Sequence, residues 1–348
     1  MPSTTDLTHA TVPPLSITLT WRDTATRWSL RWGIGRGTSR VEPGLYRIGD
    51  PSPSSPVLVT CNYRMTVDLV RRDLAGAACW LLVLETYGVN VWCAAGKGTF
   101  GTDELVRRIF AVHLADVVDH TTLVLPQFGA VGVAAQTVRE LTGYRVVWGP
   151  IRSSDLPAFL AAGLKATPAM RAVTFTLAER LALAPVELLG SLRWWWAVLV
   201  FAALAVLGAS IGAGRLMPAA ALMAVFPASL AYAIGALAGG LLVPALLPWL
   251  PGRAFSLKGA IAGALLALAG LVALPGMLGI LSPWGWAAAL LASGALASYV
   301  GVNFTGCTPY TSPSGVEREL RRAIPLQVAA LAASLVCWTV AWATRIGA

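Results

Sequence analysis

The chain has 348 residues, of which 56% are hydrophobic and only 12% are charged, and its formal net charge is +9. This composition excludes a disordered chain, which needs more charge and fewer apolar residues, and also an ordinary soluble enzyme. Residues 1–193 hold 19 Lys and Arg and 15 Asp and Glu, whereas residues 194–348 hold only 7 and 2, so a soluble half is predicted to precede a membrane half.

Residues 1–55 are predicted to form an N-terminal β-rich extension. Its central part, Leu15–Asp50, is rich in Trp and Arg. The run of Pro and Ser from Pro51 to Pro56 is typical of a linker.

Residues 56–185 alternate short β-rich runs with helical patterns. Strands are expected at Val57–Thr60, Leu81–Glu85, Leu123–Leu125, Arg145–Trp148 and Ala172–Thr176, and helices at Met65–Ala75, Thr102–Asp116, Val131–Leu141 and Leu156–Leu164. This alternation predicts an α/β fold, a Rossmann-like domain with a mostly parallel sheet and helices on both faces. Ligands of such sheets bind beyond the carboxyl ends of the strands, so the loops there are the places to look for a site.

Residues 194–348 are predicted to form an all-α transmembrane bundle of about five helices, because a bilayer core takes about 20 apolar residues to span. Stretches of that length lie near 194–213, 216–248, 258–280, 283–303 and 325–343. The second stretch is long and rich in Gly and Pro. It is either one kinked helix or a span followed by a re-entrant segment.

Basic residues near the spans predict their orientation, since Lys and Arg are retained on the cytoplasmic side. With five spans and the N-terminus inside, the inner flanks hold six basic residues, and the outer flanks hold two: Arg193, Arg253, Lys258, Arg318, Arg321 and Arg322, against Arg215 and Arg345. We therefore expect a multi-pass protein of the inner, cytoplasmic membrane, with its N-terminal domain in the cytoplasm. Five of the net positive charges belong to the membrane half, so the charge does not indicate nucleic-acid binding.

The most unusual local sequence is Asn90–Gly98, which follows a predicted strand. A Walker A phosphate loop is excluded, because that motif needs Gly at the position of Val91 and Ser or Thr at the position of Gly98. Gly96–Gly101 fits the G-x-G-x-x-G dinucleotide pattern, but about ten residues separate it from the strand that the pattern must follow directly. A nucleotide site is therefore the weaker hypothesis.

A third interpretation makes Trp92–Ala95 a short helical cap that Gly96 or Gly98 ends. The small Ala94 and Ala95 would let a large flat ligand approach the backbone. The Cys93 thiol would point to something above the sheet, although a cysteine is often only a buried small hydrophobe. Lys97, one turn later, would favour the thiolate, the form that binds soft metals.

The run Asn-Val-Trp-Cys-Ala-Ala-Gly-Lys at 90–97 resembles the cap-helix signature of the membrane-anchored corrinoid protein of the bacterial mercury-methylation pair. Residues 56–175 around it resemble the corrinoid-binding domain of the corrinoid iron–sulfur proteins of acetyl-CoA metabolism. This wider resemblance rests on Pro56–Thr60, Leu125–Val131, Gly149–Pro150 and Ser154–Pro157. The iron–sulfur relatives have a similar Ala-Ala-Gly-Lys without the cysteine, so Cys93 and the membrane bundle favour the mercury-methylation branch.

The resemblance implies that cobalamin or a related corrinoid binds over the sheet, with Cys93 as the lower axial thiolate ligand to cobalt. It implies methyl transfer to Hg(II), which gives methylmercury, as the reaction. The cofactor-binding residues that it implies are Thr60, Asn62, Tyr63, Thr66, Asn90, Val91, Trp92, Ala94, Ala95, Gly96, Lys97, Gln127, Phe128, Gly129, Ala130, Val131, Gly149 and Pro150.

None of the five cysteines forms a C-x-x-C pair, which argues against a zinc ribbon and against an intrinsic iron–sulfur cluster. The resemblance therefore implies a separate ferredoxin-like partner with 4Fe–4S clusters, together with a methyl donor protein or methylfolate, Hg(II) as substrate and membrane lipid.

Several alternatives stay open. Lys97 either neutralises a corrinoid substituent or faces solvent, and Thr60 and Thr66 either bind corrinoid amides or cap the helix that starts near Met65. The basic pairs Arg71–Arg72 and Arg107–Arg108 are either solvated helix faces or a docking site for an acidic partner. For the whole protein, the alternatives are a membrane-held corrinoid methyl carrier for another acceptor and a non-catalytic nucleotide-binding membrane sensor.

Overall fold

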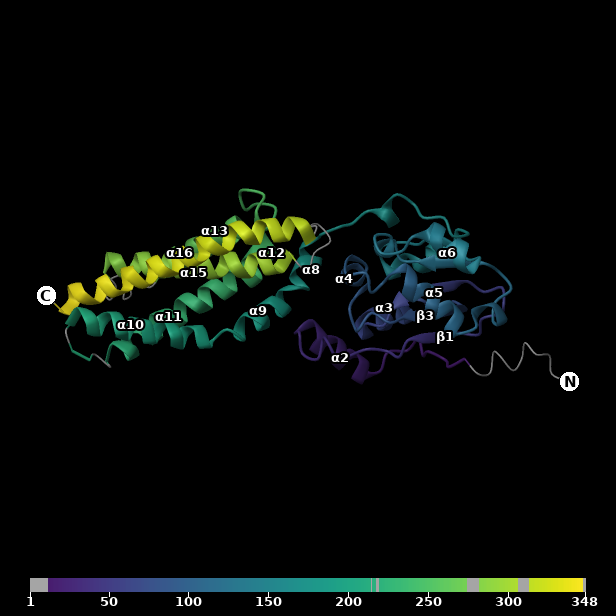
Figure 1. The fold of residues 1–348 in the computed structure, drawn as a ribbon, viewed down its shortest axis with the longest axis horizontal. Helices are drawn as coiled ribbons and strands as arrows, with labels where there is room; N and C mark the ends of the chain where they lie inside the picture. Colours follow the sequence, from purple (N-terminus) through teal and green to yellow (C-terminus); the bar gives the residue numbers. More distant parts are fainter. Residues whose placement is uncertain (1–11, 214, 217–218, 274–281, 306–312, 347–348) are drawn as a thin grey trace. The chain divides into compact units, whose positions relative to one another are not determined.

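A computed structural model gives the fold and describes residues 12–213, 215–216, 219–273, 282–305 and 313–346. Contacts between residues divide it into two units. The first unit ends at Thr174 and the second begins at Phe175, except that Arg31–Gly33 groups with the second. Figure 1 shows a sheet with helices around it in the first unit and a set of long helices in the second.

The first unit is built on a five-stranded sheet in the order β1-β3-β2-β4-β5. Its strands are β1 (Gly44–Ile48), β2 (Val57–Cys61), β3 (Cys79–Leu84), β4 (Thr122–Leu125) and β5 (Arg145–Trp148). β2 pairs in parallel with β3 and β4, and β4 pairs in parallel with β5. β1 pairs antiparallel with β3 along its whole length. The predicted mixed α/β fold with a mostly parallel sheet is confirmed.

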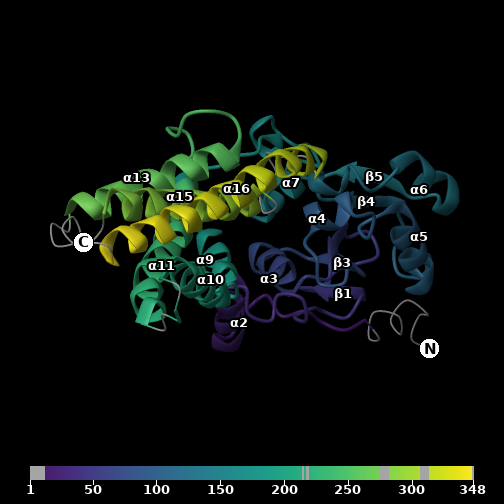
Figure 2. The same ribbon diagram turned by 60° about the vertical axis from the view of Figure 1, so that its left-hand side comes forward.

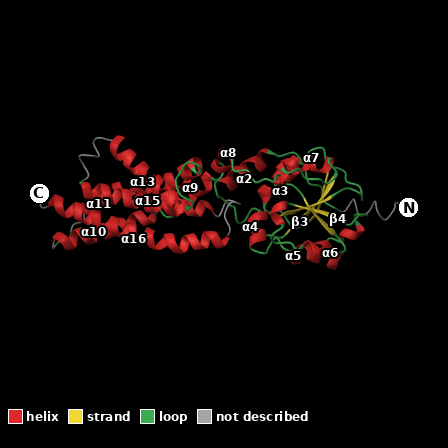
Figure 3. Cartoon of the chain, turned by 90° about the horizontal axis from the view of Figure 1, so that it is seen from above, coloured by secondary structure: helices red, strands yellow, loops and turns green. Residues whose placement is uncertain are grey.

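Helices cover both faces of this sheet. In Figure 3, α3 (Arg64–Asp73) and α7 (Leu156–Ala161) lie on one side of the strands, and α5 (Thr102–Ala111) and α6 (Ala135–Thr142) lie on the other. β3 is fully buried from end to end because both faces of the sheet are covered. A strand in such a position is a continuous apolar run in the sequence.

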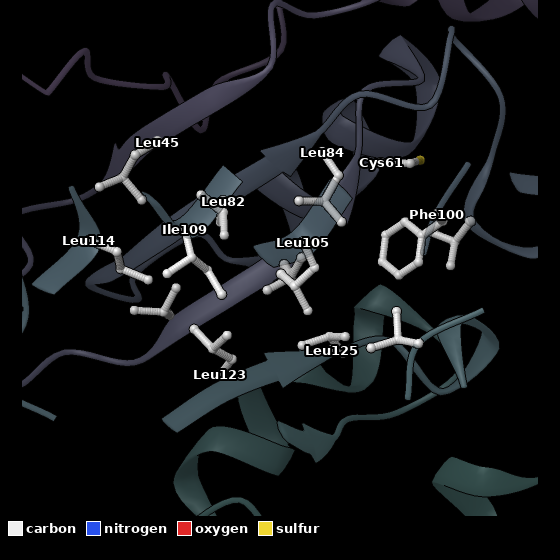
Figure 4. Close-up of a cluster of buried hydrophobic side chains, with 14 of the residues drawn as sticks. Leu45, Cys61, Leu82, Leu84, Phe100, Leu105, Ile109, Leu114, Leu123 and Leu125 are labelled. Atoms are coloured by element: carbon white, nitrogen blue, oxygen red, sulfur yellow. The ribbon is translucent and has the colours of Figure 1, made fainter. Parts of the chain in front are cut away.

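Side chains of successive β3 residues alternate between two apolar clusters. Trp80, Leu82 and Leu84 join the cluster under α5, whereas Cys79, Leu81 and Val83 join the cluster under α3. Figure 4 shows the first cluster, in which Leu105 and Ile109 of α5 lie among the leucines of β3 and β4. Because a strand's side chains alternate with a period of two, one strand stabilises both layers.

The strands predicted at Val57–Thr60, Leu81–Glu85, Leu123–Leu125 and Arg145–Trp148 are confirmed with shifts of one or two residues at most. The strand predicted at Ala172–Thr176 is wrong. This segment is extended but lies outside the sheet, and all of its residues except Phe175 are exposed. Its β-branched residues favour a strand only where a sheet can bury one face.

The predicted helices are confirmed in place but not in length. The one predicted at Thr102–Asp116 ends at Ala111, because His113 adopts a left-handed conformation with φ of 49° and a separate 3-10 turn, Leu114–Asp116, follows it. The one predicted at Val131–Leu141 begins only at Ala135.

In residues 12–55, the described part of the N-terminal region, the structure is mixed and not β-rich, which corrects the sequence-based prediction. It holds α2 (Trp21–Arg31) and the strand β1, and β1 completes the edge of the main sheet. Asp23 and Leu30 of this helix are seven residues apart and both are buried. Residues at that spacing share one face of a helix.

The described part of the second unit consists of helices joined by short turns. They are α8 (Leu177–Leu181), α9 (Ala184–Leu192), α10 (Trp196–Ala213), α11 (Ala219–Leu237), α12 (Val243–Leu246), α13 (Phe255–Ala273), α15 (Pro283–Thr305) and α16 (Pro313–Ile346). α13, α15 and α16 run side by side (Figure 2). A Cβ added at Gly259 of α13 would lie 2.3 Å from the Ala297 carbonyl oxygen of α15, so glycine allows these two helices to approach closely.

In the described residues, four helices are long and apolar enough to cross a membrane, or up to five if the bent pair Leu177–Leu192 and Trp196–Leu204 forms one span. These are candidates by length and composition. The ambiguous stretch predicted at 216–248 contains one helical run, residues 219–246, with a π-helical turn at Ala238–Leu242, and Val225–Leu246 is its candidate membrane span. Pro244 lacks the N–H that would bond to the carbonyl of Gly240, and the π-turn lies at that break. The end of the span predicted at 258–280 lies partly outside the described residues.

Within the first unit, a buried ionic network fastens α2 to α3. The Arg71 guanidinium lies 2.8 Å from a carboxylate oxygen of Asp68 and 2.9 Å from one of Asp23, and Arg64 pairs with the same two carboxylates. Burial would raise the pKa of Asp23, but hydrogen bonds from Thr20, Arg71 and Arg64 outweigh it and hold this pKa well below its usual range. Arg71 is thus not a solvated or docking residue, which corrects that expectation.

Replacing Arg71 by Met is expected to lower the free energy of unfolding by about 3 kcal/mol, because it leaves buried carboxylates without their partner. The control is Arg107→Met, which removes an ion pair with Glu104 from an arginine side chain that is 59% exposed and should cost less than about 1 kcal/mol. Thermal unfolding of the full-length protein in detergent compares the two variants. Equal midpoints would contradict a stabilising role for the network.

Candidate functional site

The loops predicted to carry the site lie together at one edge of the sheet, because β2, β3, β4 and β5 are parallel and their carboxyl ends meet there. α4 (Val91–Gly96) follows the β3 loop. It contacts β2 and the 3-10 turn η2 (Gln127–Gly129), which follows β4. The structure therefore brings together the loops that follow β2, β3 and β4 around one short helix.

A fully buried amide, that of Asn62, connects the ends of β2 and β3. Its Nδ2 donates a hydrogen bond to Glu85 Oε1 over 2.7 Å, and its Oδ1 accepts from Thr86 N, Thr86 Oγ1 and Gly88 N over 3.1, 2.8 and 3.0 Å. Glu85 Oε1 also accepts from the backbone N–H of Tyr87, which has a positive φ of 58°. These bonds fix the backbone that leads into α4.

Both ends of α4 are fixed by hydrogen bonds. The Asn90 side chain caps the helix by accepting from the Cys93 N–H over 2.9 Å. At the other end, the Ala94 carbonyl accepts from the N–H groups of Thr99 and Phe100 over 2.9 and 3.1 Å. Hydrogen bonds at both ends thus hold Cys93 in a short helix of about one and a half turns, as predicted for the helical cap.

Small residues beneath α4 allow it to pack closely on the loop after β4. A Cβ added at Gly132 would lie 2.2 Å from the Phe100 carbonyl oxygen and 3.0 Å from the Ala95 Cα, and one added at Gly129 would lie 2.5 Å from the Phe100 ring. Ala94 and Ala95 are buried in the same cluster. Their small size serves this internal packing, which corrects the expectation that they open the backbone to a ligand.

The glycine pattern at Gly96–Gly101 has a conformational explanation. It joins α4 to α5 and does not follow a strand, which the dinucleotide fingerprint requires. Gly98 has φ of 80°, and a Cβ at Gly101 would lie 2.6 Å from the Gly98 carbonyl oxygen. The turn itself needs these glycines, and this weakens the nucleotide hypothesis.

Cys93 differs from the other two cysteines of the first unit in its surroundings. Cys61 and Cys79 are fully buried, and burial raises the pKa of both thiols, that of Cys79 to about 12. Cys93 is only half-buried. Among the described residues, no three His, Cys, Asp or Glu side chains could hold a metal ion together, so Cys93 offers a single donor atom.

Burial sorts the predicted cofactor-binding residues into two groups. One group is exposed or half-buried and open to a ligand: Thr66, Asn90, Trp92, Gly96, Lys97, Gln127, Phe128, Ala130 and Val131. The other is buried in the protein and supports the loops: Thr60, Asn62, Tyr63, Val91, Ala94, Ala95, Gly129, Gly149 and Pro150. Trp92 and Phe128 are in edge-to-face contact with ring centroids 5.3 Å apart, so α4 and η2 share one aromatic surface.

Sequence reasoning missed several residues of this region. Arg171 donates hydrogen bonds to Gln127 Oε1 and to the Trp148 carbonyl oxygen, which connects the loop after β4 to the end of β5. No local pattern marks it, because its partners are 44 and 23 residues away. Glu85 ends a predicted strand and Thr86 directly follows it, and that position was the available signal. The cap of α3 is Tyr63, with no side-chain bond, so neither Thr60 nor Thr66 caps it.

Thiol alkylation of the native full-length protein is expected to modify Cys93 and to spare Cys61 and Cys79. The reason is that the two buried thiols are shielded and stay protonated at pH 7 to 8. Peptide mass spectrometry after iodoacetamide treatment measures this, with a urea-unfolded sample as the control in which all three react. Modification of Cys79 at the rate of Cys93 would contradict the burial described here.

The chain matches a family model described as CO dehydrogenase/acetyl-CoA synthase delta subunit over residues 34–160. It is 42% identical over 127 residues to the acetyl-CoA decarbonylase/synthase complex subunit gamma of Methanopyrus kandleri, and 35% identical over 126 residues to that of Archaeoglobus fulgidus. These matches cover 36% and 35% of this chain, and 27% and 26% of the relatives. The chain thus spans only about a quarter of the length of the curated relatives it matches.

These relatives confirm the expected relation of the first unit to proteins of acetyl-CoA metabolism. They also correct the identification made from the residues around Cys93. The family model and the curated relatives name acetyl-CoA synthase and decarbonylase/synthase subunits, not the corrinoid protein of the mercury-methylation pair, so the assignment to mercury methylation is wrong.

Proposed function

We propose that the first unit binds a corrinoid over the carboxyl edge of its sheet and carries a methyl group, while the second unit holds it in a membrane. The observation that carries this proposal is the rigid cap α4, which presents one half-buried thiol beside the parallel-strand ends in the segment matched to the acetyl-CoA synthase family. The chain is then a membrane-held corrinoid methyl carrier.

The matches to acetyl-CoA synthase and decarbonylase/synthase subunits support the cofactor class, cobalamin or a related corrinoid. The residues present fit it. A corrinoid would bring most of the ligands of its cobalt with it, so a single protein donor would be enough, and the Cys93 thiol would be such a donor. Beside it, Cβ atoms at Gly96 and Gly98 would meet nothing within 4 Å, so the exposed end of α4 has open space at its backbone.

The residues of the site then have distinct roles. A bound corrinoid would supply the cobalt chemistry of methyl transfer. Cys93 would provide the thiolate that holds the cobalt, and Asn90 holds its backbone in place through the cap. The aromatic surface of Trp92 and Phe128 would exclude water from the bound corrinoid. Lys97, exposed at the end of α4, would neutralise negative groups of the corrinoid.

The proposed partners follow from what this chain lacks. Its relatives are named as subunits of a complex. None of its cysteines forms a C-x-x-C pair, so an iron–sulfur protein is proposed as the electron donor that keeps the cobalt in a reactive state. A methylfolate or a methyl-carrying protein is the proposed methyl source.

The proposed location is the cytoplasmic membrane, with the first unit on the cytoplasmic side. Four candidate spans, or up to five, support insertion. The excess of basic residues on the predicted inner flanks supports the orientation.

The purified full-length protein, incubated with cob(II)alamin, is expected to retain a single corrinoid per chain. The variant Cys93→Ala should retain it with a shifted absorption spectrum, because the axial donor is lost while the rest of the site remains. Cobalt analysis and visible spectroscopy measure both properties. Cys79→Ala is the matched control, since that thiol is buried beneath α3.

Two results would count against this proposal. A protein that retains no cobalt but binds a nucleotide would be a sensor of the kind that the glycine pattern suggested. An unchanged absorption spectrum in Cys93→Ala would show that the thiolate is not a ligand of the cobalt, while the proposal of corrinoid binding would still stand. Transfer of a labelled methyl group from methylfolate to the loaded protein then tests the carrier function.

Replacing Gly132 by Ala is expected to weaken corrinoid binding by about tenfold, because the added Cβ would force α4 away from the loop after β4. Gly37→Ala is the control, since its Cβ would meet nothing within 4 Å. Equilibrium titration with cob(II)alamin gives the two dissociation constants. Equal constants would show that the position of α4 does not govern cofactor binding.

A further inference from the structure

α2 is the purple helix in Figures 1 and 2. It exposes large aromatic side chains that the proposed methyl carrier does not use. Trp21 is 75% exposed, Trp28 is 60% exposed and Ile34, just after the helix, is 62% exposed. Trp21 and Trp28 are seven residues apart, so they share one face of the helix. We call Trp21, Arg22, Trp28 and Ile34 the α2 patch.

The opposite face of α2 is anchored in the first unit. Leu30 is 1% exposed and belongs to the apolar cluster under α5. Asp23 pairs with Arg64 over 2.6 Å and with Arg71 over 2.9 Å. The α2 patch is therefore held rigidly outward, because turning the helix over would break a buried ionic network and expose Leu30.

The segment that carries the patch is strongly basic. Residues 20–40 contain five arginines, Arg22, Arg27, Arg31, Arg36 and Arg40, and one acidic residue, Asp23. Asp23 is 9% exposed and paired with Arg64 and Arg71 outside this segment. Arg22 also lies over the Trp21 ring, 5.5 Å from its centre. Exposed tryptophans thus occur together with an excess of positive charge.

A bilayer surface fits this combination. Tryptophan is enriched at membrane interfaces, where its ring lies at the level of the headgroups, and arginines pair with anionic headgroups. Single-stranded nucleic acid also binds Trp and Arg surfaces. The bilayer is favoured because the same chain carries at least four candidate membrane spans, which keep a lipid surface permanently near the first unit.

We propose that the α2 patch is an interfacial membrane contact that binds anionic phospholipid, independently of the helices of the second unit. The inference rests on the proposed membrane location. Its consequence is a second attachment point, which restrains the corrinoid domain at the membrane surface.

The test uses the full-length protein in lipid nanodiscs with a photoreactive benzoylphenylalanine in place of Trp21 or Trp28. In discs that contain phosphatidylglycerol, both positions should form lipid adducts at about ten times the level of a probe at Phe110. Phe110 is the matched control, since it is 59% exposed on α5 of the same unit. Adding Arg22→Gln should lower the Trp28 adduct about fivefold in these discs and leave it unchanged in pure phosphatidylcholine. Mass spectrometry identifies the adducts.

A probe at Leu265, 58% exposed on the candidate span α13, separates failure of the patch from failure of the membrane location. Lipid adducts at Leu265 with none at Trp21 and Trp28 would overturn the inference and leave the membrane location intact. Crosslinking of the probe that replaces Trp21 to protein or to added oligonucleotide, instead of lipid, would overturn the inference in the same way. Loss of lipid adducts at Leu265 as well would overturn the membrane location and this inference with it.

Discussion

The buried amide of Asn62 is the interaction on which the candidate site depends. It joins the carboxyl ends of β2 and β3 through hydrogen bonds to Glu85, Thr86 and Gly88. A buried polar group without such partners would cost several kcal/mol, so the network is stable only when the two strand ends and the loop after β3 are all in place. The loop then enters α4 in one conformation, and the position of Cys93 follows from it.

Glycines occur where two segments pack closely, and buried polar networks fix the course of the backbone. Gly132 lets α4 approach the loop after β4, and Gly259 lets α13 approach α15 in the second unit. Asn62 directs the loop before α4, and the network around Arg71 directs α2. The two kinds of constraint hold a half-buried thiol at one edge of the sheet and an exposed aromatic surface on another element of the same unit.

The comparisons and the structure bear on different parts of the chain. The family match covers residues 34–160, which include the whole sheet and α4 but neither α2 nor the second unit. The relatives therefore inform the proposed corrinoid site, and the proposed membrane attachment rests on the composition and helices of this chain. The chain spans about a quarter of the length of these relatives.

The sequence by itself determined the α/β class, four of the five strands that were predicted, the helical second half and the cap at Asn90–Gly96, because these depend on local periodicity and capping. Predictions from the sequence were wrong for the N-terminal region and for Ala172–Thr176, where contacts with distant parts of the chain decide the secondary structure. Only the tertiary structure showed that Ala94 and Ala95 face the core, that Arg71 is buried between two carboxylates, and that Arg171 reaches Gln127. Each of these depends on contacts between residues far apart in the chain, which local patterns do not encode.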